Sequence, residues 1–354
     1  MCRLEVKINE TEKTYPIYIT NKDIENLKNS IISEIENKNY IVVINKKVFK
    51  LYGELLNFPN ENIFILPDGE KEKNFKNYTK ILDFAFKKNL KRDDAIIAIG
   101  GGVVGDLAGF CASTYMRGIN YIQVPTTLLA DTDSSVGGKT AINTKFGKNL
   151  IGAFYQPKAV FINVNFLKTL DMRQFKSGLG EVLKYGFIEK STGEDLELMN
   201  FLNQNYPKIL SRDIFTLSEL IETCIKLKIS VVNQDEKEKG LRRILNFGHT
   251  YGHAIEKLSN YKYTHGECVI EGIYKALDIA FKLGKIDKEY KFLGEDLIKK
   301  FNFTRLPNFD KNKIINTITI DKKSDQNGVN YILPIEYSSV ESFKFSIEEL
   351  KKLI

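Results

Sequence analysis

The sequence predicts an α/β fold in two parts, with the functional site in the cleft between them. The first part is an N-terminal Rossmann-like parallel-sheet domain over residues 1–170, and the second is a mostly α-helical domain over residues 171–354. Strand-like and helix-like runs alternate in the first half, long helical patterns fill the second, and a glycine-rich turn follows a buried-type strand. A chain of 354 residues also has the length of two domains.

Short apolar runs in the first half have the character of buried strands. They are IVVI (41–44), IFIL (63–66), AIIAI (95–99), YIQV (121–124) and AVFINV (159–164). Between the second and third of these, residues 69–88 place apolar side chains at helical spacing. Strands that alternate with helices are joined by crossovers, so the sheet should be parallel.

From about Asp171 onward the pattern becomes helical. Helical periodicity runs over residues 172–190, 216–233, 241–258, 268–283 and 287–301. Near the end, VNYILPIE (329–336) indicates a separate strand pair. Residues 190–215 do not show whether they form one element or several.

Composition excludes several classes of protein. Hydrophobic residues make up 43% and charged residues 27%, which is typical of a globular chain rather than a disordered one. The net charge of +7 comes without an arginine-rich tract, so we expect no nucleic-acid partner, whereas a small anionic substrate is compatible. The longest apolar stretch is too short to span a bilayer, and four scattered cysteines indicate a reducing compartment. We therefore expect a cytoplasmic protein without a membrane partner.

The glycine-rich turn, Gly100 to Gly105, reads GGGVVG and fits the GxGxxG pattern between a strand and a helix. Glycines there let backbone N–H groups approach a pyrophosphate, and the helix N-terminus adds partial positive charge. The acidic residue that usually binds the ribose about 20 residues later is absent. The alternative is a turn that serves tight packing only.

All three histidines lie within one short segment, as NFGHTYGHAIE and THGE. His249 and His253 are four residues apart on one helix face, and His265 begins the next helical pattern. This spacing suits a metal ion. Either the three imidazoles form the site, or a carboxylate replaces one of them and frees an imidazole for acid–base work.

Other polar residues gather in a glycine-rich segment and on helix faces. The segment DTDSSVGGKTAINTKFGKN (131–149) is typical of neither a helix nor a strand, and we expect a polar functional loop there. Further candidates are Glu181 and Lys184, three apart on one helix face, and Lys228, Arg242 and Asn246 ahead of the first histidine. Each alone would be an ordinary surface residue.

Together these blocks resemble the 3-dehydroquinate synthase family. The similarity includes GGGVVGDLAGFCASTYMRG, QVPTTLLADTDSSVGGKTAIN, GKNLIGAFYQP, GEVLKYG, GLRRILNFGHTYGHAIE, HGE and the late DKK, in order over residues 41–333. The resemblance implies conversion of 3-deoxy-D-arabino-heptulosonate 7-phosphate to 3-dehydroquinate and phosphate in the shikimate pathway, with NAD and Zn²⁺ or Co²⁺ as cofactors.

The resemblance also implies roles for individual residues. Glu181, His249 and His265 would be the metal ligands. The cofactor-binding set would be Asn45, Glu70, Lys73, Gly101, Gly102, Val103, Asp106, Thr126, Thr127, Asp133, Lys139, Lys148 and Thr169. The substrate-binding set would be Arg117, Lys139, Asn149, Lys184, Lys228, Arg242, Asn246, His253 and Lys323. Catalytic roles would fall to Asp133, Lys139, Lys184, Asn246 and His253.

Two further points follow from the resemblance. Arg117 would reach the neighbouring subunit's site, which implies a homodimer. Asn45 stands where the family commonly has the aspartate that bonds the adenosine ribose, so we expect weaker discrimination between NAD⁺ and NADP⁺. A preference for NAD⁺ beyond roughly a hundredfold would contradict that expectation.

Rival functions are another sugar-phosphate cyclase, a metal-dependent polyol dehydrogenase, or a binding protein without activity. The lysines and the arginine favour an anionic substrate over a polyol.

Overall fold

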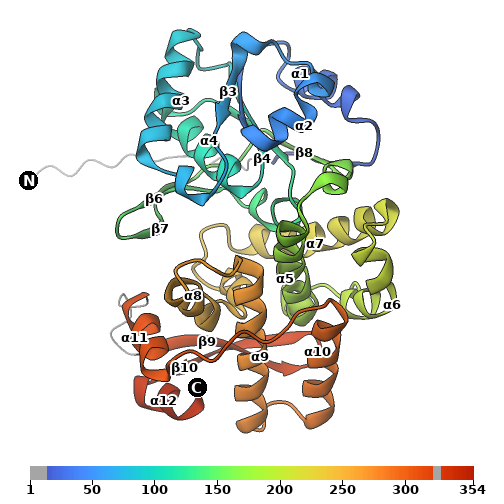
Figure 1. Cartoon of the computed structure of the whole chain (residues 1–354), viewed down its shortest axis with the longest axis vertical. Coiled ribbons are helices and arrows are strands. Elements are labelled where there is room, and N and C mark those ends of the chain that lie inside the picture. The colour runs from blue at the N-terminus through green and yellow to red at the C-terminus, as the bar shows by residue number, and fades with distance from the viewer. Residues whose placement is uncertain (1–13, 322–327) are drawn as a thin grey trace, which may run out of the picture.

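The computed structural model describes residues 14–321 and 328–354. Its first half is built on one parallel sheet of six strands in the order β1-β8-β5-β4-β2-β3. The strands are β1 (Ile17–Thr20), β2 (Tyr40–Asn45), β3 (Ile63–Leu66), β4 (Ala95–Gly100), β5 (Asn120–Pro125) and β8 (Ala159–Asn163). The predicted α/β fold with a parallel sheet is confirmed, and Figure 1 shows this sheet above the helical half.

Helices cover both faces of the sheet because neighbouring residues of a strand point to opposite sides. On one face, Val42 and Ile44 pack in a core with α1 (Leu27–Glu34) and α2 (Lys46–Leu56). On the other, Ile41 and Val43 pack in a core with α3 (Phe75–Lys87) and α4 (Gly102–Thr114). A sheet buried on both faces has near-continuous apolar strands, which is how β4 reads.

The segment predicted as a polar functional loop is different in the structure. It contains a π-helical turn at Ala130–Ser134 and then an antiparallel hairpin of β6 (Lys139–Thr144) and β7 (Gly147–Phe154). The prediction of a loop was wrong for the hairpin, because only Thr140, Ala141 and Ile142 are buried, beside α4, and most of β7 is exposed. A strand that buries so few side chains lacks the alternation by which strands are found. The hairpin projects from the sheet domain toward the helical half (Figure 1).

The second half is helical, as predicted. It comprises α5 (Met172–Ile188), α6 (Leu198–Leu210), α7 (Ile214–Gln234), α8 (His249–Leu258), α9 (His265–Lys282), α10 (Lys288–Lys300), α11 (Lys311–Asp321) and α12 (Ile347–Leu353). The predicted strand pair is β9 (Val329–Glu336) with β10 (Ser339–Phe345), which are antiparallel. The undecided segment 190–215 holds one main helix, α6.

One predicted helix is two elements. Residues 241–258 form a 3-10 segment at Leu241–Asn246 and then α8, which begins at His249. Gly248 separates them with φ of +77°, in the left-handed region that favours glycine. Its backbone also lies against α9, where a side chain would meet the carbonyl of Val269 and the side chain of Ile273. The break therefore fixes where α8, and with it His249, begins.

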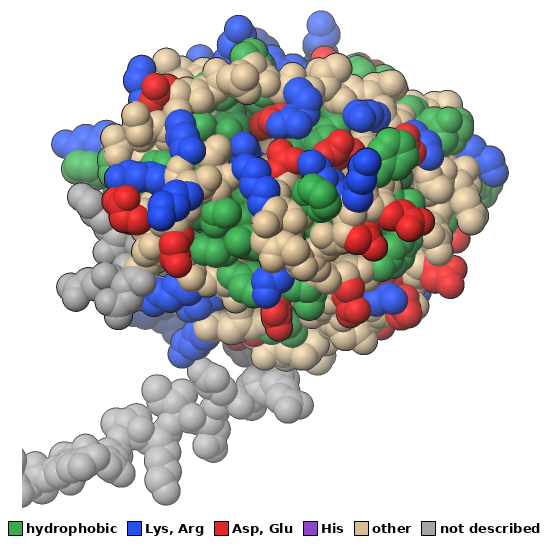
Figure 2. Space-filling view, turned by 90° about the horizontal axis from the view of Figure 1, so that it is seen from below, with side chains coloured by type: hydrophobic (Ala, Val, Ile, Leu, Met, Phe, Trp, Pro, Cys, Tyr) green, Lys and Arg blue, Asp and Glu red, His purple; other side chains and the backbone are tan. Residues whose placement is uncertain are grey.

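The lower end of the helical half carries a mixed surface. Figure 2 shows basic, acidic and apolar side chains interspersed over this face, without a field of one charge. In the part of the chain that the structure describes, no helix has both the length and the apolarity needed to cross a bilayer.

Candidate metal and cofactor site

Glu181, His249 and His265 converge at the junction of three helices. Oε1 of Glu181, on α5, lies 3.4 Å from Nε2 of His249 and 3.2 Å from Nε2 of His265. The carboxylate is fully buried, and among the described residues nothing donates a hydrogen bond of good geometry to its Oε1. A buried acceptor without a donor indicates a missing partner.

Glycines at the helix crossings allow this convergence. A Cβ on Gly180 would lie 2.5 Å from the carbonyl oxygen of Gly266 and 2.6 Å from its Cα, so α5 and α9 touch backbone to backbone. Glu181 and His265 are the chain neighbours of these two glycines. Thr264 fixes the start of α9 through a capping box with Glu267, which sets His265 as the first residue of that helix.

The donor set fits a divalent ion such as Zn²⁺. Two ligand atoms about 2.1 Å from one tetrahedral ion lie about 3.4 Å apart, close to the separations seen here. Nδ1 of His249 faces the carbonyl oxygen of Phe247 at 3.0 Å, and Nδ1 of His265 faces Glu256 at 3.3 Å. Each Nδ1–H then has an acceptor, so each Nε2 is left as a ligand atom, as is usual for metal-binding histidines.

The electrostatics of the cluster also suit a cation. Burial lowers the pKa of His249 to about 3, against the charge of Glu181, so this imidazole is neutral at pH 7. Burial alone would lower the pKa of His265 as well, but Glu181 and Glu256 raise it to about 10. Burial would raise the pKa of Glu181, yet Lys184 and His249 hold it below its ordinary range. The cluster thus keeps a positive charge beside two carboxylates, which a metal ion can replace.

His253 lies on the same face of α8 as His249, with ring centroids 5.1 Å apart. Its ligand atom and those of His249 and His265 lie within 4.8 Å of one another. His253 is exposed, whereas His249 and His265 are partly buried. The structure therefore brings all three predicted imidazoles to one place.

Glu256 is a site residue that the sequence analysis did not identify. It is mostly buried on α8, contacts His265 through Oε2, and forms an ion pair with Lys148 at 2.6 Å through Oε1. The Lys148 ammonium also lies 4.1 Å from the centre of the Tyr261 ring. Lys148, predicted to bind the cofactor, thus reaches from β7 to the carboxylate that contacts His265, a predicted metal ligand.

The glycine turn lies at the carboxyl end of β4. A Cβ on Gly101 would meet the side chain of Thr127 at 3.0 Å, and one on Gly102 would meet Oγ of Ser134 at 3.1 Å. Gly102 and Val103 open α4, so their N–H groups are available to an anion, whereas those of Val104 and Gly105 donate to the carbonyl of Gly101. Such a cradle, which a side chain would fill, fits a dinucleotide pyrophosphate.

Three predicted cofactor residues form a charge network next to this turn. Lys73 is buried and contacts Asp106 at 2.9 Å and Glu70 at 3.2 Å. Asn143 of the hairpin donates to Glu70 at 2.7 Å. Burial raises the pKa of Asp106, and the charge of Lys73 opposes this shift.

Thr126 and Asn45 lie at the ends of strands, and Thr169 ends the 3-10 segment Val164–Thr169 that follows β8. Thr126 follows β5, and its N–H donates to the carbonyl of Gly100. Thr169 contacts the hydroxyl of Tyr52 at 2.6 Å. Asn45 ends β2, and its amide donates to Asp68 at 2.6 Å.

Buried Lys184 and Lys228 and partly buried Asp133 form a charged group between the two halves. Lys228 donates to the carboxylate of Asp133 at 2.8 Å and to its backbone carbonyl, and Tyr185 donates to the same carboxylate oxygen at 2.8 Å. Lys184 contacts Oε2 of Glu181, one turn away on α5. Burial would raise the pKa of Asp133, but Lys228 and Lys184 hold it well below its ordinary range.

Arg242 is almost fully buried for a cationic side chain. Its guanidinium donates to the carbonyl oxygens of Gly137, at 3.0 Å, and Glu236, and lies 5.9 Å from the centre of the Phe154 ring. Its Nε has no acceptor among the described residues. A buried donor of this kind fits a ligand carboxylate or phosphate.

Lys139 and Asn246 are joined by Glu238, a second site residue that the sequence analysis missed. The Lys139 ammonium contacts Oε2 of Glu238, and the Asn246 amide donates to Oε1 at 2.6 Å. Glu238 lies in the charged run DEKEKG with φ of +57°, which a glutamate rarely adopts. Its sequence surroundings look like a solvated loop, so no signal singled it out.

Two predicted substrate residues do not join this group. Arg117 is exposed on the turn after α4, and Asn149 is exposed on β7. Lys323 lies outside the described residues, as does Lys322. Their predicted roles stay predictions.

Family models match most of the chain. The model for the 3-dehydroquinate synthase N-terminal region matches residues 63–177, and the model for the C-terminal region matches residues 178–324. The chain is 44% identical over 339 residues to the 3-dehydroquinate synthase of Dictyoglomus thermophilum, covering 95% of this chain and 93% of that one. The chain belongs to the 3-dehydroquinate synthase family.

Solved structures agree with this family assignment. A 2-deoxy-scyllo-inosose synthase complexed with carbaglucose-6-phosphate, NAD⁺ and Co²⁺ superposes with a TM-score of 0.83 at 27% identity, covering 95% of each chain. ValA, a 2-epi-5-epi-valiolone synthase from Streptomyces hygroscopicus subsp. jinggangensis with NAD⁺ and Zn²⁺ bound, has a TM-score of 0.87 at 21% identity over 98% of each chain. The second likeness shows that the 3-dehydroquinate synthase fold is shared.

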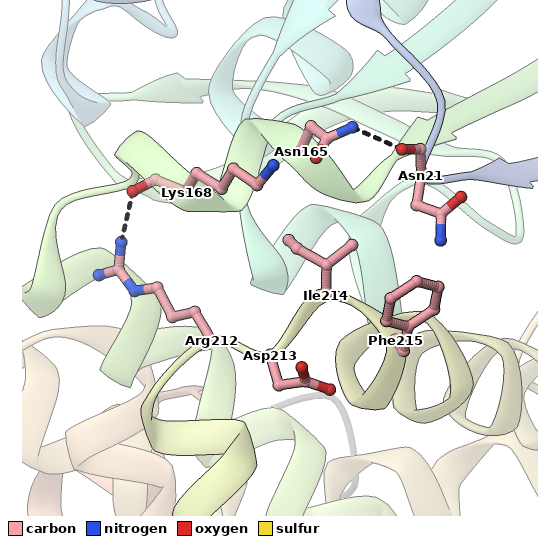
Figure 3. Close-up of a pocket in the computed structure, with 7 residues that line it drawn as sticks. All are labelled: Asn21, Asn165, Lys168, Arg212, Asp213, Ile214 and Phe215. Atoms are coloured by element: carbon pink, nitrogen blue, oxygen red, sulfur yellow. Dashed lines mark hydrogen bonds between the residues drawn. The ribbon is translucent and has the colours of Figure 1, made fainter.

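A separate hollow is lined by none of the predicted site residues. It has a volume of about 520 Å³ and is lined by Asn21, Asn165, Lys168, Arg212, Asp213, Ile214 and Phe215 (Figure 3). Several of its polar groups are already paired: Asn165 donates to the carbonyl of Asn21, and Arg212 to that of Lys168.

Proposed function

We propose that this enzyme converts 3-deoxy-D-arabino-heptulosonate 7-phosphate to 3-dehydroquinate and phosphate, using the residues gathered between its two halves. The observation that carries the proposal is the convergence of Glu181, His249 and His265 in a helical half that also buries the cations Lys184, Lys228 and Arg242. Lys184 pairs with Glu181 and Lys228 with Asp133, and because burying charges is costly, their burial supports a function for them.

Glu181, His249 and His265 would hold Zn²⁺ or Co²⁺, which would polarise the substrate's hydroxyl oxygens and make their protons more acidic. Glu256 orients His265 from behind, and the carbonyl of Phe247 orients His249. Lys184 neutralises the second oxygen of Glu181. These three contacts keep the ligand atoms aimed at one point.

We expect NAD⁺ to be held by the glycine turn, Thr126, Thr127 and the Lys73–Asp106 pair. When bound, NAD⁺ would accept a hydride from carbon 5 of the substrate and return it later. Asp106 and Lys73 compensate each other's charge beside the turn, so the first turn of α4 remains the local anion-binding group. Thr169, Glu70 and Asn45 would contact the rest of the dinucleotide.

The buried cations match the two anionic ends of the substrate. Arg242 and Lys228 suit the carboxylate, because the guanidinium offers a planar fork and its Nε has no acceptor yet. Lys139 and His253, with Asn149 and Lys323, suit the phosphate. Both Lys139 and Asn246 would exchange Glu238 for substrate oxygens.

The proton on carbon 6 becomes acidic once carbon 5 is a ketone. We propose that the departing phosphate takes this proton while Lys139 and His253 hold the phosphate. The site then needs few protein bases. Asp133, Lys184 and Asn246 would position the intermediates. Ring closure would then follow in the same place, where the protein keeps the chain in a productive shape.

We further propose that the enzyme is a homodimer in which Arg117 completes the partner's site. Met116 and Arg117 both have positive φ, of +48° and +70°, which is unfavourable for side chains of this size. Arg117 is exposed and has no partner among the described residues. The turn packs on Tyr155, whose hydroxyl donates to Ile119 at 2.7 Å, just after the exposed apolar face of β7.

Subunit complementation tests the dimer. Mixing an Arg117→Ala variant with a Lys139→Ala variant, each inactive alone, should restore activity in heterodimers, because one of their two sites has both residues intact. Sedimentation should give twice the mass of the chain. A monomer, or mixing without recovery, would contradict the role of Arg117.

Product analysis tests the reaction. Incubating the purified chain with the heptulosonate phosphate, NAD⁺ and Zn²⁺ should release phosphate with no net change in absorbance at 340 nm, and the product should be 3-dehydroquinate by NMR. Accumulation of NADH would indicate a polyol dehydrogenase. Turnover of a phosphosugar without a carboxylate instead would indicate another cyclase.

We propose a cytoplasmic location. Cys111, Cys224 and Cys268 are buried and unpaired, and burial raises the pKa of each thiol. Neutral, enclosed thiols suit a reducing compartment. Fractionation of cells that produce the protein would test this.

A further inference from the structure

The β6–β7 hairpin contacts both the charge network beside the glycine turn and the helical half. The backbone N–H of Asn143 donates to the carbonyl of Lys73 at 2.8 Å, and its side-chain amide donates to Glu70 at 2.7 Å. The same side chain accepts a hydrogen bond from the backbone N–H of Asn149 at 3.0 Å, across the hairpin. Lys148, the residue before Asn149, then reaches α8. A continuous series of contacts thus leads from the network beside the glycine turn to the helical half.

The hairpin is irregular where these contacts are made. The pairing register of β6 and β7 shifts between Ile142 and Thr144, which places Asn143 at a bulge. Asn149 has φ of +56°, in the left-handed region. Bulges change the direction of side chains and are common beside functional sites. This part of the hairpin is therefore shaped to direct side chains rather than to extend a ladder.

The Lys148 ammonium lies between a carboxylate and an aromatic ring. It is 2.6 Å from Oε1 of Glu256 and 4.1 Å from the centre of the Tyr261 ring. Tyr261 has φ of +60°, which is unfavourable for a large side chain, and its N–H donates to the carbonyl of Glu256 at 3.0 Å. The other oxygen of Glu256, Oε2, faces Nδ1 of His265 at 3.3 Å. One carboxylate is thus shared between a cation of the sheet half and a predicted metal ligand.

We propose that the Lys148–Glu256 pair couples the cofactor site to the metal site, so that each ligand raises the affinity of the protein for the other. The proposal rests on the NAD⁺ and metal sites proposed above. Glu256 is the shared group, because its two oxygens face Lys148 and His265. Asn143 is a positioning residue that ties the Lys148 end of the hairpin to the network beside the glycine turn.

The sign of the coupling follows from the charges. Lys148 can leave Glu256 for the pyrophosphate of a dinucleotide, which is also an anion. Without the ammonium, Glu256 accepts more strongly from Nδ1–H of His265, and Nε2 of His265 then becomes a better ligand. In the other direction, a cation on Nε2 strengthens the Nδ1–H donor, draws Glu256 toward it and repels Lys148. The coupling is therefore favourable, and its factor must be the same in both directions.

The alternative is that Lys148 and Glu256 only fasten the two halves together. The pair would then stay closed whatever is bound, and neither ligand would change the affinity for the other. The exposure of the two side chains differs, at 32% for Lys148 and 10% for Glu256. The ammonium can therefore move toward a ligand while the carboxylate stays beside His265, which favours coupling over a fixed fastening.

Zinc affinity with and without the cofactor tests the proposal in the full-length protein, without turnover. Competition with a chromophoric chelator should give a Kd for Zn²⁺ that is roughly fivefold lower, or more, at saturating NAD⁺. Calorimetry should show NAD⁺ binding strengthened by the same factor when Zn²⁺ is bound. In Glu256→Gln this factor should fall to about one. The matched control is Glu219→Gln, on the exposed face of α7, which should keep the wild-type factor.

A second variant tests the other end of the path. Asn143→Asp keeps an acceptor for the N–H of Asn149 and loses the donor to Glu70, so the coupling factor should decrease. Asn233→Asp, at an exposed position of α7, adds the same charge and should leave the factor unchanged. An unchanged factor in Asn143→Asp would overturn the positioning role of Asn143.

Two outcomes would overturn the coupling itself. Equal zinc affinities with and without NAD⁺ in the wild type would show that the two sites are independent. Full coupling in Glu256→Gln would show that the ligands interact by another route, and both results would leave the two sites in place. If the protein binds neither Zn²⁺ nor NAD⁺, the proposed function fails, and this inference fails with it.

Discussion

Several side chains of the candidate site have a partner that fixes their charge and direction. Glu181 has Lys184 on one oxygen, His265 has Glu256 on Nδ1, and Asp133 has Lys228. A buried charge without such a partner would be costly. Two of the buried atoms that lack a partner among the described residues, Oε1 of Glu181 and Nε of Arg242, belong to this site, and we expect a ligand to meet them.

The first prediction concerns Arg242. Because its guanidinium donates to two backbone carbonyls, an alanine would remove structure as well as charge, so lysine is the sharper substitution. Arg242→Lys keeps the charge but loses the fork, and kcat/KM should fall roughly ten- to a hundredfold. Steady-state kinetics with near-UV circular dichroism checks this. Arg243→Lys, on an exposed neighbour, should behave like the wild type, and similar kinetics for both variants would remove Arg242 from substrate binding.

The second prediction concerns Glu256. Glu256→Gln removes the negative charge behind His265 and leaves Lys148 without its ion-pair partner. Metal affinity should fall roughly tenfold to a hundredfold, as it does when residues behind metal ligands are changed. Competition with a chromophoric zinc chelator measures this. Glu219→Gln, on the exposed face of α7, is the control, and equal affinities would show that Glu256 does not support the ligand.

At the scale of secondary-structure elements, the site depends on how closely helices approach. α5 and α9 touch at Gly180 and Gly266, and α8 and α9 touch along Gly248, Gly252 and Gly272. Larger residues at these crossings would push the helices apart. Glu181 follows Gly180, His249 follows Gly248 and His265 precedes Gly266, so a shift of the helices would move all three predicted ligands.

Two glycines of α5 provide a matched test. A Cβ at Gly180 would strike the backbone of Gly266, so Gly180→Ala should cost about 1–3 kcal/mol of unfolding free energy and weaken metal retention. A Cβ at Gly186 would find side-chain contact at 3.3 Å or more, so Gly186→Ala should be neutral or gain up to about 1 kcal/mol. Chemical denaturation and metal content after gel filtration measure both. Equal stabilities and metal contents would refute the role of the crossing.

For the whole molecule, polar contacts between the two halves define the site. Lys139 reaches Glu238, Lys148 reaches Glu256, and Asp133 holds Lys228. Each pair joins a residue before 170 to one after it. We therefore expect substrate binding to affect how the two halves are held together, because the same charged side chains would take part in both.

Acid should weaken one of these links. The pKa of Asp133 in the folded protein lies well below its unfolded value of about 3.9, so its contribution to stability is present above that value and is lost as pH falls through the folded pKa. Asp133→Asn should thus be less stable than the wild type at pH 7, where Lys228 loses its counter-charge. The difference should shrink as pH falls below about 4. Thermal unfolding from pH 7 to pH 2.5 checks this, and a constant difference would contradict it.

The sequence by itself determined the parallel sheet, the helical second half and the types of residue in the site. Buried strands such as β4 read as continuous apolar runs, and a metal site could be predicted because the histidines cluster in the chain. Glu181 was implied as a ligand only by the family resemblance. Local periodicity and rare residue types are properties of the chain, so they can be read without a fold.

Only the tertiary structure decided which partners these residues have. Glu238 and Glu256 look like solvated charges in the sequence, and the β6–β7 hairpin looks like a loop, because their roles depend on residues about 100 positions away. The same holds for Asp68, which becomes a neighbour of Asn45 only because β2 and β3 pair in the sheet. Contacts between distant segments arise from packing and strand order, and these are set by the folded chain as a whole.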